Sequence, residues 1–89
     1  MPDPTFEDLL EFPARMTLRV MGVASPDLRE RCLQRAERVS GRAVEAVESK
    51  ASSKGNYVVH RLTLTSDSAD QLRAVYEGLR SLDGVRLVL

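Results

Sequence analysis

The sequence predicts an α+β fold in which two helices cover one face of a four-stranded antiparallel sheet. Four segments alternate apolar and polar residues with the period of a strand, and two repeat apolar residues with the period of a helix. These segments follow one another in the order βαββαβ. The chain has 89 residues, which is the size of one small domain.

Residues 1–13 form an acidic lead-in, and the domain is expected to occupy residues 14–89. Asp3 followed by Pro4 is typical of the start of a short helix. Pro13 ends this segment, because the residue before a proline avoids the helical region. The lead-in is therefore predicted to be a separate short element rather than part of the sheet.

Residues 14–22 are predicted to form the first strand, because Met16, Leu18 and Val20 alternate with polar residues. Ser25-Pro26-Asp27 then predicts a helix start, with a cap residue, proline in the first turn and an acid near the positive dipole end. Glycine is typical of helix ends, so we expect this helix to stop before residue 41. Its apolar stripe comprises Leu28, Cys32, Ala36 and Val39.

Residues 42–49 are predicted to form the second strand and residues 57–65 the third, joined by a dense turn signal at 51–56. Ser68 and Gln71 match the capping box that opens a helix, which we expect to run to about residue 82. A turn at Asp83-Gly84 leads to a last short strand at residues 85–89.

Two strand–helix–strand units separated by a hairpin make the ferredoxin-like arrangement, a two-layer sandwich. Right-handed crossovers then place the strands in the order 4-1-3-2, with all neighbours antiparallel. The residues expected to face the helices are Met16, Leu18, Val20, Val44, Ala46, Leu62, Leu64, Val85 and Leu87.

The opposite face of the sheet is not covered by any predicted element. By the alternation of the strands, this face carries Glu45 and four arginines, Arg15, Arg19, Arg61 and Arg86. They form either a solvated surface or a docking patch for an acidic partner. One candidate partner is the chain's own lead-in, in cis or from a second copy, through Asp3, Glu7, Asp8 and Glu11.

The amino-acid composition of the chain argues against several classes of function. Lys+Arg and Asp+Glu balance at 13 each, so the overall positive charge of a nucleic-acid binder is missing. Two Tyr, two Phe and no Trp predict an aliphatic core and few base-stacking surfaces. One Cys permits no internal disulfide and no thiolate metal cluster, so no metal or cofactor is predicted. A single cysteine also suggests a reducing compartment. Because the sequence shows neither a secretory signal nor a membrane-spanning segment, it predicts a cytoplasmic protein.

The turn after the second strand is chemically rich for a hairpin loop. Glycine and asparagine supply positive φ angles at low cost, so a simple turn explains the segment. Alternatively, backbone amides, two hydroxyls and a lysine converge there on an anion. Both interpretations stay open for Ser52, Ser53, Lys54, Gly55, Asn56 and Tyr57.

No catalytic constellation is predicted. His60 is the single histidine and has no nucleophile at a recognisable spacing, so a structural role is expected. Cys32 lies on the apolar stripe of the first helix and is expected in the core. Acylphosphatase shares the fold but needs an arginine in the turn after the first strand, and that turn contains none.

Four segments of the sequence carry a family resemblance, and they are Glu11-Phe12-Pro13, Val20-Met21-Gly22, Ser52-Ser53-Lys54-Gly55-Asn56-Tyr57 and Val85-Arg86-Leu87-Val88-Leu89. They resemble the YbeD-like family of small bacterial proteins, which are labelled lipoate regulatory proteins or domains of unknown function. The resemblance covers residues 7–89 and implies an ACT-like βαββαβ fold, similar to the regulatory domain of phosphoglycerate dehydrogenase. The turn at residues 22–27 lacks the second glycine of the usual ACT ligand turn.

These observations predict a non-catalytic regulatory or adaptor module that binds a protein partner or a small metabolite, without a membrane. The apolar last strand at the sheet edge favours a homodimer, and its short length argues for protection instead. The alternative is an RNA-binding module that uses the open face of the same topology. The arginines favour RNA, whereas the zero net charge and scarce aromatics make nucleic acid the weaker expectation.

Overall fold

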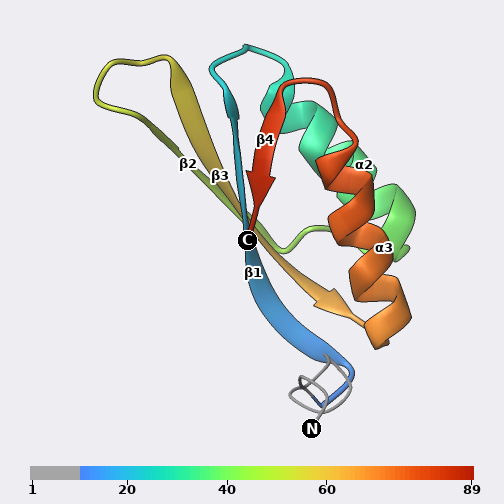
Figure 1. The fold of residues 1–89 in the computed structure, drawn as a ribbon. Helices are drawn as coiled ribbons and strands as arrows, with labels where there is room; N and C mark the ends of the chain where they lie inside the picture. The colour runs from blue at the N-terminus through green and yellow to red at the C-terminus, as the bar shows by residue number, and fades with distance from the viewer. Residues whose placement is uncertain (1–10) are drawn as a thin grey trace, which may run out of the picture.

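The computed structural model describes residues 11–89, so the short helix predicted within the lead-in lies outside the described residues. The sheet is antiparallel with the order β2-β3-β1-β4, which confirms the predicted order. Both helices pack against one face of it and leave the other face bare (Figure 1). The elements are β1 (Ala14–Val23), α2 (Leu28–Ser40), β2 (Ala46–Ala51), β3 (Tyr57–Ser66), α3 (Ala69–Arg80) and β4 (Val85–Val88). No helix within 11–89 is long and apolar enough to cross a membrane.

The core lies between the sheet and the two helices and is aliphatic, as predicted. Leu18 of β1 and Leu62 of β3 are paired in the sheet and are both fully buried. The helices supply the other side, and their buried side chains repeat every three or four residues because one stripe of each helix faces the sheet. These helix residues are Leu28, Cys32, Ala36, Leu72, Val75 and Leu79.

The helix ends agree with the sequence in part. The Ser68 hydroxyl accepts the Gln71 backbone N–H at 3.1 Å, which is one half of the predicted capping box. The Gln71 side chain accepts from the Asp67 amide instead of that of Ser68. The cap of α2 is Asp27 rather than Ser25, and it makes no side-chain cap bond. The Ser25 hydroxyl donates to the Asp27 carboxylate, which lowers the pKa of Asp27.

The predicted faces of β2 are wrong by one position. Val47 pairs with Leu62 and faces the helices, whereas Ala46 pairs with Thr63 on the bare face. Val44 packs against the core as predicted. Glu45 also reaches the bare face, so the alternation breaks where the chain enters the sheet. The regular strand therefore begins at Ala46 and not at residue 42.

Leu87 was expected to face the helices, and this prediction is also wrong. The register of β4 against β1 shifts at Met21/Gly22, so that Val88 pairs with Val20 while Leu87 pairs with Met21 on the bare face. Gly84 approaches β1 closely, and its carbonyl accepts the Val23 N–H at 2.9 Å. The four-residue length of β4 and this irregularity both limit pairing of the edge with another strand.

Candidate binding surface on the open sheet face

The bare face has two halves, and in the half near Ala14 the polar side chains hydrogen-bond to one another. The Thr17 and Thr63 hydroxyls lie 2.9 Å apart. Glu45 accepts from Arg15 at 3.0 Å and from the Thr65 hydroxyl at 2.8 Å. The hydrogen bond from Thr65, followed by that from Arg15, lowers the pKa of Glu45. The donors and acceptors of this half therefore already have partners, and few of them are available to a ligand.

The other half begins with two arginines that lie directly opposite each other. Arg19 of β1 pairs with Arg61 of β3, and partners in the ladder project from the same face. Glu48 lies on the far side of Arg61 in the ladder. Within residues 11–89, no ion pair joins either arginine to an acid. Like charges placed opposite each other are unfavourable, and Glu48 across from Arg61 offsets this repulsion only in part, because it forms no ion pair with either arginine.

Large apolar side chains continue the same half of the face towards the β2–β3 hairpin. Met21, Tyr57, Leu87 and Leu89 are 39%, 46%, 44% and 54% exposed. They are the exposed large apolar residues of the described chain, and all four line a single groove. Scattered exposed apolar residues are ordinary, whereas a gathered set marks a binding surface.

We name this depression the open-face groove. Its volume is about 540 Å³, and Val58 and Val59 add to its apolar surface. Its polar lining residues are Arg19, Lys50, Ser52, Ser53 and Arg61. No acidic side chain of the described chain lines it. The groove can therefore receive an apolar body and an anionic group together.

The structure brings half of the predicted loop to this groove. Ser52, Ser53 and Tyr57 line it, whereas Lys54, Gly55 and Asn56 do not. The turn uses its own amides, since Ser52 N–H donates to the Tyr57 carbonyl at 2.8 Å and Gly55 N–H donates to the Ser52 carbonyl at 2.9 Å. These contacts favour a hairpin turn over a separate anion site made of backbone amides.

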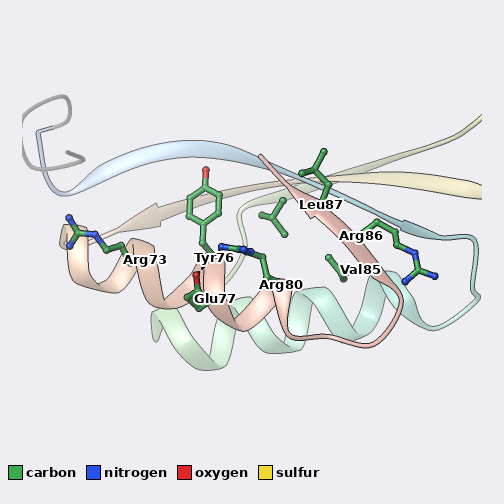
Figure 2. Close-up of a pocket in the computed structure, with 8 residues that line it drawn as sticks. Arg73, Tyr76, Glu77, Arg80, Val85, Arg86 and Leu87 are labelled. Atoms are coloured by element: carbon green, nitrogen blue, oxygen red, sulfur yellow. Dashed lines mark hydrogen bonds and ion pairs between the residues drawn. The ribbon is translucent and has the colours of Figure 1, made fainter. Parts of the chain in front are cut away.

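The predicted arginine patch divides into three parts. Arg19 and Arg61 share the groove, Arg15 is paired with Glu45, and Arg86 lies elsewhere. Arg86 lines a second groove between α3 and β4 (Figure 2) and does not line the open-face groove with Arg19 and Arg61.

The second groove has a volume of about 660 Å³ but is a weaker candidate. Two of its arginines are already in ion pairs, Arg80 with Glu77 at 3.1 Å and Arg73 with Asp70 at 3.0 Å. Of the exposed large apolar residues, it contains Leu87 alone within the described chain. The open-face groove has both the apolar surface and two arginines that no ion pair of residues 11–89 engages.

Ser49 is a neighbour of His60 that the sequence analysis missed. The two residues pair across β2 and β3, and Ser49 Oγ lies 2.6 Å from His60 Nδ1. His60 is 4% exposed, and its Nε2 is buried without a hydrogen-bond partner in the described chain. Counting outward from the hairpin turn would have found this pair. No third group of the described residues orients the ring, so the pair lacks the arrangement of a nucleophile and its base.

The buried histidine makes stability depend on pH. Burial, together with the positive charge of Arg29, lowers the pKa of His60 below its ordinary value. Between the lowered value and about 6.5, the unfolded chain binds more protons than the folded chain. The free energy of unfolding should therefore fall as the pH drops through this range and stay level just above it. Urea denaturation at pH 5 to 8 measures this, and His60→Gln should remove the slope; an unchanged slope would assign it to other groups.

Comparisons with known proteins fit this picture of the fold. Residues 7–89 match the family described as "Protein of unknown function (DUF493)". A UPF0250 protein from Vibrio vulnificus is 41% identical over 88 residues, covering 98% of this chain and 94% of the relative. One from Yersinia enterocolitica is 40% identical over 82 residues, covering 92% and 93%.

Two solved structures share the fold. A protein from H. pylori, solved in solution, aligns with a TM-score of 0.75 at 18% identity, covering 100% of this chain and 94% of that one. The ACT domain from GTP pyrophosphokinase of Chlorobium tepidum aligns with a TM-score of 0.67 at 15% identity, covering 84% and 94%. The fold is thus ACT-like, as the resemblance implied. With a family match across almost its whole length, the chain belongs to the DUF493 family.

Proposed function

We propose that the protein is a non-catalytic regulatory module that binds a segment of a protein partner in the open-face groove. The segment is apolar and carries acidic residues. The observation that supports this is the convergence of the exposed large apolar side chains with Arg19 and Arg61 in one groove. The likeness to an ACT domain supports a regulatory role.

The shape of the surface favours a polypeptide over a small metabolite. Sites for small molecules bury about 70–90% of the ligand. The open-face groove lies on the bare side of the sheet, where no helix of the described chain covers it (Figure 1). A small ligand would remain largely in solvent there, whereas a protein segment brings its own cover. Acidic residues on that segment would complement a lining whose side chains, among the described residues, include cations and no carboxylate.

A displayed library of random 12-residue peptides tests the proposal. We expect enriched peptides to combine apolar residues with Asp or Glu. Titrated into the ¹⁵N-labelled protein, they should shift the amides of β1, β3 and β4 around the groove. Arg19→Glu should weaken binding at least about 10-fold, because it places a like charge against the acidic peptide. The matched change Arg38→Glu, at an exposed position of α2, should leave binding unchanged.

Two outcomes would overturn the proposal. One is enrichment of peptides without acidic residues, or shifts confined to the helices. The other is tight binding of a 12-nucleotide uridine RNA that weakens steeply with salt, which is the behaviour of a nucleic-acid binder. Single-stranded RNA is recognised largely by stacking on aromatic side chains. Tyr57 is the single aromatic residue that lines the groove within the described chain, so we expect no such binding.

A further inference from the structure

Opposite residues in an antiparallel ladder form either a hydrogen-bonded or a non-hydrogen-bonded pair, and side chains are closer together in the second type. Arg19 and Arg61 form a pair of this second type. The Arg19 N–H donates to the Leu89 carbonyl, and the Arg19 carbonyl accepts the Leu89 N–H, at 2.8 Å each, just beyond the end of β4. The N–H and C=O groups of Arg19 therefore point away from β3, so Arg19 and Arg61 share no backbone hydrogen bond. In such pairs the side chains start about 5 Å apart. Two guanidinium groups thus rise from one small area of the bare face.

The charge of this area matches a doubly charged group better than a single carboxylate. A carboxylate carries one charge on two oxygens, which one arginine satisfies through a bidentate contact. A phosphoryl group carries about −1.5 to −2 at pH 7 on three acceptor oxygens, so it can engage two guanidinium groups at once. Lys50, which pairs with Val59 on the same face, adds a third cation to the lining.

The apolar surface begins immediately beside the arginines. Met21 follows Arg19 by two positions on the same face, and Leu89, which directly follows β4, lies across from Arg19. An anionic group held by the arginines would therefore carry an apolar body along the groove towards Leu87 and Tyr57. This order of charge and apolar surface is what a phosphorylated residue within an apolar segment requires.

We infer that Arg19 and Arg61 form a phosphoryl-binding site, and that the protein partner is recognised through a phosphorylated residue. The inference rests on the proposed function for the identity of the partner. The anion site is independent of the proposed function and can be tested alone. The unpaired arginines are held opposite each other at a cost in stability, as binding groups are.

Two small aryl probes test the anion site directly by chemical-shift titration of the ¹⁵N-labelled protein. Phenyl phosphate should bind at least about 10-fold more tightly than phenylacetate at pH 7.5 and shift the Arg19 and Arg61 amides. Its binding should weaken below about pH 6, where the phosphoryl group takes up a proton. The variant Arg19→Gln/Arg61→Gln should abolish binding, and Arg38→Gln should not alter it. Equal affinity for the two probes, or shifts elsewhere, would overturn the inference.

A stability measurement separates a binding role from a structural one. Arg19→Gln removes the repulsion from Arg61, so the melting temperature should rise by about 2 to 4 °C while phenyl phosphate binding falls. A lower melting temperature would mean that the arginines support the fold, and it would count against the inference.

A peptide comparison distinguishes this inference from the proposed function. In a display-selected peptide, the acidic residue that binds beside Arg19 is replaced by phosphoserine, and affinity should increase at least about 10-fold. If the acidic peptide binds and phosphoserine brings no gain, the inference fails and the proposed function stands. If phenyl phosphate binds at the arginines but no peptide does, the proposed partner fails and the anion site stands.

Discussion

Leu62→Ala is expected to lower the free energy of unfolding by about 3 kcal/mol, whereas Leu87→Ala should lower it by less than about 1 kcal/mol. Both changes remove the same atoms from a strand of one sheet. Leu62 is fully buried beneath the helices, so its truncation leaves a cavity. Leu87 is 44% exposed on the bare face, where water fills the vacated space. Urea denaturation at pH 7.5 measures both values.

The same pair of variants separates folding from binding. Leu87→Ala should weaken a display-selected peptide at least about 10-fold, because it removes apolar surface of the groove that the peptide would bury. The folded fraction of Leu62→Ala should bind that peptide as the natural chain does. If Leu87→Ala were as destabilising as Leu62→Ala, the apolar half of the bare face would have a structural role and the proposed surface would be lost.

Gly22→Ala is expected to lower the free energy of unfolding by about 2–3 kcal/mol, as overpacking of a tight site does. A Cβ atom at Gly22 would lie 2.6 Å from Leu28 Cδ2 and 2.7 Å from the Gly84 carbonyl oxygen. The Leu28 side chain can move only within the core, and the Gly84 oxygen belongs to the backbone that leads into β4. Relief of the clash would therefore displace β4 and, with it, Leu87.

Gly41→Asn is the control for this change. Gly41 has a φ of 70° at the end of α2, and a Cβ there would meet nothing within 4 Å. Asparagine is the usual alternative to glycine at this position, so the cost should stay below about 1 kcal/mol. Thermal and urea unfolding of both variants compare them. Equal costs at the two glycines would show that the close approach of β1 and Gly84 does not hold β4 in place.

The long strands and both helices could be predicted because burial of one face alone determines their pattern of apolar and polar residues. Leu18 and Leu62 alternate with polar residues since one face of each strand is buried and the other is bare. Prediction failed in the short strands, where the face of a residue depends on contacts outside the strand. Leu87 turns to the bare face because β4 changes register beside Gly22, and no pattern within residues 85–89 records that change.

The candidate site was predicted in pieces. Alternation placed Arg19 and Arg61 on the bare face, and turn composition singled out the hairpin, but only the fold shows that they border the same groove. Leu87 was missed because the alternation from Val85 assigned it to the core face, whereas Met21 was placed opposite the core but was not singled out as a binding residue. The Ser49–His60 pair was missed because the start of β2, and hence its faces, was placed wrongly.

A spin label on a bound peptide tests the central claim most directly. With a nitroxide at one end of a display-selected peptide, paramagnetic broadening should be strongest at amides of β1, β3 and β4 near Met21, Tyr57 and Leu87. The amides of α2 and α3, on the other side of the sheet, should keep their intensity. Broadening centred on the helices, with the bare face unaffected, would contradict the assignment of this face as the binding surface.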